Sequence, residues 1–194
     1  MPVEPLTRIL TRILAVLALW LCAWPAAAGV VLTFYGHEGL QVRGGWVNFP
    51  HAYVRFSGTL ETGEPVERAV GFTARDPGPQ LLLFSGAGIV KEPEPAYVAE
   101  GIPYLSVEIS DETYHALTQR IAWWATPEGS RYNLNRRNCI AFVADLAERT
   151  GLRTPAHETL SPNGFLKDMV AMNPPGSIVG LLPAPVRYEL AQAA

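Results

Sequence analysis

Apolar and polar residues alternate along much of the first half of the chain, which is the period of a half-buried β-strand. The alternation is clearest over residues 52–60, and residues 30–35 form a short apolar run of the kind found in buried strands. The Glu-Thr-Gly-Glu-Pro segment at 61–65 has the composition of a turn. Residues 66–74 are therefore expected to return beside 52–60 as the second strand of a hairpin.

Two further apolar runs, at residues 81–84 and 105–109, predict two more strands. The proline-rich stretch 93–103 lies between them. In the second half the apolar residues recur at helical spacing, and Ser110, Asn138 and Ser161 are suited to begin helices. Helices are expected over three segments: 110–125, 138–151 and 161–172. The predicted fold class is α+β, with an antiparallel sheet packed against helices.

The first 28 residues have the organisation of a secretory signal peptide. Arg8 and Arg12 precede a short apolar run at 13–24, and small residues follow at 26–28. The run is shorter than the roughly 20 residues that a spanning helix needs. Cleavage before Gly29, with export to the periplasm or the medium, is therefore favoured over a retained membrane anchor.

Residues 29–194 are long enough for one domain with its own core. The full chain has 15 basic and 18 acidic side chains; removing Arg8, Arg12 and Glu4 leaves 13 and 17, a net charge of −4. This composition excludes the basic footprint of a nucleic-acid binder. No later segment is apolar for long enough to cross a membrane. No metal or cofactor is expected, because the histidines lack helical ligand spacing and one cysteine is too few for structural zinc.

Cys139 is the one cysteine that remains after processing, since Cys22 lies in the signal segment. A lone cysteine in an exported protein is a buried small hydrophobe, an intermolecular link or a reactive thiol. Cys139 begins the second predicted helix, where unpaired N–H groups and the helix dipole lower the pKa of a thiol. Arg136 and Arg137 are expected to add to this field, although the apolar stripe that follows fits a core cysteine equally well.

Two short motifs favour a catalytic role for this cysteine. Asn138-Cys139-Ile140-Ala141-Phe142-Val143 contains the pattern Asn-Cys-x-x-Phe-Val, and Phe49-Pro50-His51-Ala52-Tyr53-Val54-Arg55 places a histidine at the start of a predicted strand. Together they resemble circularly permuted papain-like thiol hydrolases, the group of the permuted NlpC-type hydrolases and the lecithin retinol acyltransferase relatives. The resemblance covers roughly residues 30–152, and Gly71-Phe72-Thr73-Ala74 is also similar to exported members.

The resemblance implies that Cys139 is a nucleophile, that His51 is its base, and that a polar residue on the next strand orients the imidazole. A simple hairpin places Ala74 across from His51, whereas a one-residue slip places Thr73 there and a longer extension reaches Asp76. Thr73 is named as the third residue.

The sequence pattern limits where two of the histidines can lie. His51 shares strand parity with Arg55 and not with the apolar Val54, so it is expected at the mouth of the strand. A sheet covered on both faces would permit this position, although the pattern does not require one. His37 lies in a Gly-rich connection, where a solvated loop is favoured over a position near the substrate.

Three functions remain open. The leading one is hydrolysis of an amide through a thioacyl-enzyme, with a peptide stem of peptidoglycan as a substrate. Lipid acyl transfer or thioester hydrolysis is the alternative among enzymes, because relatives of this architecture do both. The third is a non-catalytic binding or structural protein that keeps Asn138 and Cys139 in its core. A sulfur beside the imidazole in an open groove favours an enzyme, and a sealed Cys139 favours the structural role.

Overall fold

The computed structural model describes residues 29–42, 45–157, 159–177 and 180–182. The expected signal peptide, residues 1–28, lies outside these ranges. Within them, every helix is too short or too polar to cross a membrane.

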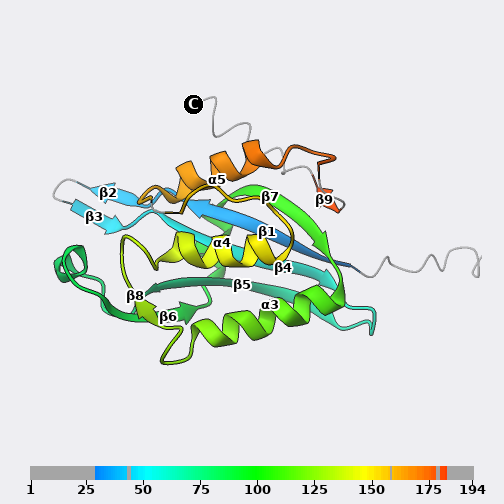
Figure 1. The fold of residues 1–194 in the computed structure, drawn as a ribbon, viewed down its shortest axis with the longest axis horizontal. Coiled ribbons are helices and arrows are strands. Elements are labelled where there is room, and N and C mark those ends of the chain that lie inside the picture. The colour runs from blue at the N-terminus through cyan, green and yellow to red at the C-terminus, as the bar shows by residue number, and fades with distance from the viewer. Residues whose placement is uncertain (1–28, 43–44, 158, 178–179, 183–194) are drawn as a thin grey trace, which may run out of the picture.

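A seven-stranded antiparallel sheet forms the centre of the molecule (Figure 1). Its strand order is β8-β6-β5-β4-β1-β7-β9, so the two strands of the predicted hairpin lie next to each other near the middle. The bounds are β1 Gly29–His37, β4 His51–Thr59, β5 Pro65–Ala74, β6 Gly86–Lys91, β7 Ile102–Ile109, β8 Arg131–Tyr132 and β9 Leu181–Leu182. A separate hairpin consists of β2 Leu40–Val42 and β3 Gly45–Asn48.

Three helices pack on one face of this sheet (Figure 1): α3 Asp111–Trp124, α4 Cys139–Arg149 and α5 Pro162–Met172. Each begins after the residue that the sequence predicts as its cap. The side chains of Ser110, Asn138 and Ser161 accept hydrogen bonds from backbone N–H groups of the first turn. The apolar faces of the helices and the inward side chains of β1, β4 and β5 form one core. The expected α+β class is confirmed.

The carboxylate of Asp145 holds α4 against α3. It accepts hydrogen bonds from Arg120 Nε at 2.5 Å and from Trp124 Nε1 at 2.7 Å, both on α3. Arg149, one turn further along α4, adds a third at 3.0 Å. Charge-assisted bonds of this kind are short and directional. They fix the position of the helix that carries Cys139.

The opposite face of the sheet is covered near one end by a short helix, α2, over Pro95–Glu100. Pro95 stands in its first turn, where the missing N–H of proline costs no hydrogen bond. This segment lies within the stretch 93–103 that the sequence presents only as a connection. The sheet is therefore covered on both faces at this end, an arrangement that the parity of His51 permits but does not require.

The apolar run at 81–84 is not a strand, so that prediction is wrong. Residues Pro79–Leu82 form a 3₁₀ turn, η1, and strand β6 follows only at Gly86. Pro79 sets the first turn, and Leu81 is the buried member of the run while the next three residues are exposed. Because this run does not alternate buried and exposed side chains, it lacks the two-residue period of a half-buried strand.

The hairpin between β4 and β5 closes with a three-residue turn. The Leu60 N–H donates to the Glu64 carbonyl at 2.9 Å, and the Gly63 N–H donates to the Leu60 carbonyl at 2.8 Å. Gly63 has a φ of 86°, the left-handed conformation that such a turn needs. Thr59 consequently pairs with Pro65. This register is one residue away from the simple hairpin.

Candidate active site

Cys139 is the first residue of α4 and lies at the end of the sheet where β4 begins. Asn138 caps the helix: its Oδ1 accepts from the N–H groups of Ile140 and Ala141 at 2.9 and 3.1 Å. The Cys139 thiol accepts a hydrogen bond from the backbone N–H of Ala52. The sulfur therefore lies against the peptide group that joins His51 to Ala52.

The strands part at this point and leave room for the thiol. The pairing of β4 with β5 runs from Thr59 to Tyr53, which lies opposite Gly71. From Gly71 onward β5 pairs with β6. Ala52 is the next residue of β4 after the last pair, and its N–H is the one that reaches the sulfur.

Burial raises the pKa of the Cys139 thiol to about 11, although hydrogen bonds from backbone N–H groups lower it. The side chain is 8% exposed. The expectation of a lowered pKa is therefore wrong for this closed form, because loss of hydration outweighs the helix terminus. A sealed thiol is also what the structural alternative predicts.

The two upstream arginines do not act as expected either. Arg137 turns away and donates to the Gly129 carbonyl from Nε and Nη2, at 3.1 and 2.9 Å. Its guanidinium lies 4.4 Å from the ring centre of Trp124. Arg136 is exposed. Burial and backbone N–H groups, and not these two charges, set the pKa of the thiol.

His51 is the first residue of β4 and is half-buried. It shares the sheet face of Tyr53, whose ring lies 6.4 Å away, centre to centre. A Cβ added to Gly71 would stand 2.8 Å from His51 Nε2, so the imidazole lies over that glycine. Burial, and then the charge of His37, lower the pKa of His51 to about 4. At neutral pH both the imidazole and the thiol are uncharged.

Thr73 occupies the level of His51 on β5. Continuing the observed register beyond the Tyr53–Gly71 pair brings Thr73 opposite His51, which is the one-residue slip considered above. The two strands have parted here, and Thr73 pairs with Ile89 of β6 instead. Among the described residues its hydroxyl donates no hydrogen bond to the imidazole.

His37 lies beside His51, although the sequence favours a solvated loop for it over a position near the substrate. It is the last residue of β1 and pairs directly with His51, so it is not in a solvated loop. Its ring stacks on Tyr97 of α2 at 4.1 Å between centres, and its Nδ1 accepts from the Gly39 N–H at 3.1 Å. The Nε2 atom lies 3.7 Å from Glu100 Oε2. The signal available in the sequence was only a histidine that follows the apolar run 30–35.

Tyr97 closes the site from the α2 side. It stacks on His37 and contacts Tyr53 at 5.8 Å between ring centres. Burial, and then the charge of a Cys139 thiolate, raise the pKa of Tyr97 to about 12. Burial, and then the same thiolate charge, also raise the pKa of Tyr132 of β8 to about 12.

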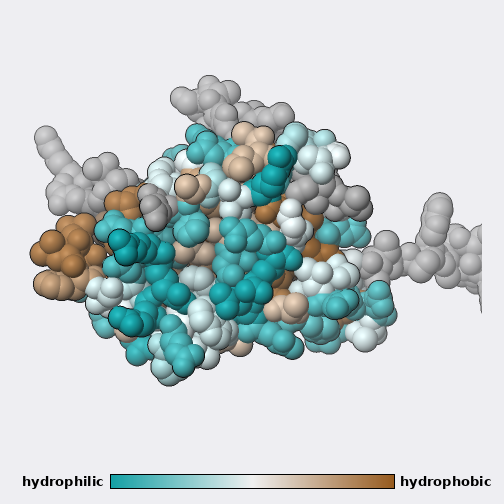
Figure 2. All heavy atoms as spheres, viewed as in Figure 1, coloured by the Kyte–Doolittle hydropathy of each residue, from teal (hydrophilic) through white to brown (hydrophobic). Residues whose placement is uncertain are grey.

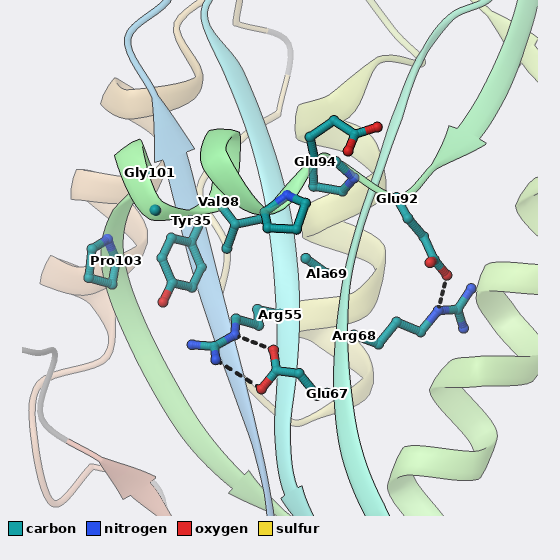
Figure 3. A pocket seen from close by; sticks show the side chains of 13 residues that line it. Tyr35, Arg55, Glu67, Arg68, Ala69, Glu92, Glu94, Val98, Gly101 and Pro103 are labelled. Atoms are coloured by element: carbon teal, nitrogen blue, oxygen red, sulfur yellow. Dashed lines mark hydrogen bonds and ion pairs between the residues drawn. The ribbon is translucent and has the colours of Figure 1, made fainter.

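An open pocket of about 810 Å³ lies beside α2, on the sheet face that His51 shares (Figure 3). Two ion pairs line it: Arg55 holds Glu67 through two hydrogen bonds of 2.7 and 2.9 Å, and Arg68 holds Glu92 at 2.7 Å. Tyr35 stands at the edge of the pocket and stacks on Tyr53 at 5.3 Å. Neither Cys139 nor His51 lines this pocket.

Cys139 is expected to react with iodoacetamide more slowly than free cysteine at pH 7, because a thiol with a pKa of about 11 contains little thiolate there. The rate should rise with pH up to about 11. Tyr97→Ala should increase it at least about tenfold by opening the site, whereas Tyr97→Phe, which keeps the ring, should match the wild type. Mass spectrometry follows the adduct. A rate above that of free cysteine at pH 6 would instead indicate a thiolate–imidazolium pair.

Acid should destabilise the protein through His51. Its pKa is about 4 in the folded state and about 6.5 when unfolded. The unfolded state therefore binds the proton first, so this contribution is complete above pH 6.5 and is lost as the pH falls to 4. The loss amounts to about 3 kcal/mol in the free energy of unfolding. Urea unfolding at pH 7 and pH 4 measures it, and His51→Gln should show a correspondingly smaller difference. An identical difference in both proteins would contradict the assignment.

No protein-family model and no curated protein matches the chain. Among solved structures, the crystal structure of a Type VI secretion system effector, TseH, is similar to it, with a TM-score of 0.47 and 16% sequence identity. The match covers 74% of this chain and 88% of that one.

Proposed function

We propose that the chain is an exported cysteine hydrolase with a circularly permuted papain-like fold, and that it cleaves an amide through a thioacyl intermediate. The observation that carries this proposal is the Cys139 thiol at the start of α4, held against the peptide that joins His51 to Ala52. Acyl transfer needs a nucleophile and a base that can take its proton, and His51 is the proposed base. His51 precedes Cys139 in the chain, which is the permuted order.

The reaction has two steps. The Cys139 thiol gives its proton to the neutral His51 imidazole while the sulfur attacks the carbonyl carbon of the substrate. The tetrahedral intermediate collapses to a thioester, and the imidazolium returns the proton to the departing amine. Water, activated by the same imidazole, then hydrolyses the thioester and restores the thiol. Thr73, at the level of His51, and His37, its neighbour on β1, are the two candidates to orient the imidazole.

Substrate must displace Tyr97 or α2 before it reaches the sulfur. The helix has six residues, none of them buried, and it lies between Pro93 and Pro103. Such an element has little packing to hold it in place. Its movement would hydrate Cys139 and His51, and so bring the two pKa values back toward their ordinary ranges. The buried thiol is then a closed resting form.

The pocket beside α2 favours a peptide over an acyl chain. Its walls carry the Arg55–Glu67 and Arg68–Glu92 pairs, which suit a ligand with charged groups, such as a peptide stem of peptidoglycan. Acyl transfer or thioester hydrolysis on a lipid remains the second candidate, supported by the same thiol and imidazole.

Trapping the intermediate tests the proposal. The protein is incubated with a panel of muropeptides and a panel of acyl lipids, quenched in acid and analysed by mass spectrometry. We expect an acyl adduct on Cys139 that hydroxylamine removes, together with a free amine released from one muropeptide. Cys139→Ala is the control for adducts elsewhere. An adduct from acyl lipids alone selects the second candidate, and the absence of any adduct after Tyr97→Ala has opened the site favours a structural cysteine.

Export is tested by the N-terminus of the secreted protein. Because the apolar run at 13–24 is short and ends in small residues, the mature chain is expected to begin at or near Gly29. Intact mass and N-terminal sequencing of the periplasmic fraction decide this. An uncleaved chain in the membrane fraction would replace the exported form with an anchored one.

A further inference from the structure

The connection between β5 and β6 presents an apolar tip to solvent. Leu82, Leu83 and Phe84 are consecutive and are 66%, 81% and 66% exposed. Figure 2 shows hydrophobic residues gathered at one end of the molecule, where this connection projects in Figure 1. Scattered exposed apolar residues are common, but a contiguous group marks a contact with a protein or a membrane.

Specific contacts hold the tip in its conformation. Leu81 is buried in the core and anchors it, while the N–H groups of Leu83 and Phe84 both donate to the Gln80 carbonyl, at 3.1 and 2.9 Å. The Gln80 side chain donates to the Asp76 carbonyl at 3.2 Å. The turn therefore holds three apolar side chains outward and one inward.

Arginines surround the base of the tip. The Arg75 N–H donates to the Ala87 carbonyl, and Ala87 pairs with Arg131, so these two arginines flank the strand that leaves the tip. Arg136 follows Asn133, whose side chain donates to Ser85 Oγ at 3.1 Å. All three are exposed, and none forms an ion pair within the described part of the chain. Asp76 is the acidic residue beside them.

We propose that Leu82–Phe84 insert into the surface of an anionic phospholipid bilayer, with Arg75, Arg131 and Arg136 at the level of the headgroups. A convex apolar tip enters the acyl boundary of a bilayer without any matching pocket, and cations beside it are attracted to anionic lipid. The net charge of the chain is −3, so the arginines are a local feature that complements such a surface. A protein partner would need a cavity shaped for the tip.

The tip lies at the same end of the sheet as the candidate active site. The connection begins directly after β5, at the end of the sheet where β4 starts and where Cys139 lies. Inserting the tip would hold this end toward the membrane. The contact involves neither Cys139 nor His51, so it stands or fails independently of the proposed hydrolysis.

A fluorophore at the tip tests the proposal. In the full chain with Cys22→Ser and Cys139→Ser, Leu83→Cys is labelled with an environment-sensitive dye. Vesicles of phosphatidylcholine with phosphatidylglycerol should shift its emission to the blue, and phosphatidylcholine alone should do so only weakly. Met172→Cys is the matched control, because Met172 is 36% exposed and ends α5 beside the segment that follows α4, away from the end where Cys139 lies. Its dye should not shift.

Two variants separate the contributions. Adding Leu82→Ser and Phe84→Ser should abolish the shift at position 83. Replacing Arg75, Arg131 and Arg136 by glutamine should raise the anionic lipid needed for half of the shift at least about tenfold. The proposal is overturned if the dye at position 83 stays in water, if positions 83 and 172 shift equally, or if the shift appears without lipid as the protein is concentrated. The last result would identify a second copy of the chain as the occupant.

Discussion

Cys139→Ser is expected to fold normally and to lose hydrolytic activity by at least about a thousandfold. A serine hydroxyl is a much weaker acid than a thiol, and the His51 imidazole, with its pKa of about 4, is too weak a base to compensate. The serine oxygen can accept the same hydrogen bond from the Ala52 N–H that the sulfur accepts. The free energy of unfolding should therefore change by no more than about 1 kcal/mol.

Turnover of the substrate that the panels identify gives the activity, and urea unfolding gives the stability. Cys139→Ala is the matched control: it should be equally inactive, and it should be less stable than the serine variant because the Ala52 N–H loses its acceptor. If the serine variant keeps more than about a tenth of the activity, the thiol is not the nucleophile. If both variants are active and only their stability differs, Cys139 is a structural residue.

Long periodic elements and helix caps were predictable because their signals are local. Asn138 caps α4 where the sequence places it, so the position of Cys139 in the first turn follows from two adjacent residues. The hairpin of β4 and β5 follows from its alternation and from the Gly63 turn. Its register depends on the conformation of one glycine, and composition alone does not decide between Thr73 and Ala74 opposite His51.

The pKa of the thiol was not predictable because its cause is not local. The sequence places Cys139 at a helix terminus, which lowers the pKa. The burial that raises it comes from the core of the folded domain, which brings together residues far apart in the sequence. Tertiary packing of distant residues determines the sign of the shift.

The strand position of His37 was missed for a similar reason. Gly36 interrupts the apolar run of β1 and gives the segment the composition of a loop. In the structure a Cβ at Gly36 would stand 2.8 Å from the Tyr104 ring and would meet Asn163 of α5. The glycine therefore allows close packing within a continuing strand, which is the other meaning of glycine in a strand.

Gly71→Ala is expected to displace the His51 imidazole and to lower hydrolytic activity about a hundredfold, because small errors in the position of a catalytic group are costly. The new Cβ would lie 2.8 Å from His51 Nε2, closer than real Cβ contacts, and 3.1 Å from Tyr53 Cβ, which is tight but requires only a small shift. Gly71 does not have a positive φ, so alanine introduces no backbone strain. The imidazole is the group that must move. We expect the pKa of His51 to rise from about 4 toward its ordinary value as the ring becomes hydrated.

NMR titration of His51 and substrate turnover measure these two effects together. Ser57→Ala is the control, because it changes one atom on the same face of the sheet, six residues along β4 from His51 and outside the pocket proposed for the substrate, and should leave both values unchanged. If Gly71→Ala acts through the imidazole, the double variant with His51→Ala is no less active than His51→Ala alone. Multiplied losses in the double variant, or an unchanged pKa of His51, would show that Gly71 acts through packing on Tyr53 and not through the proposed base.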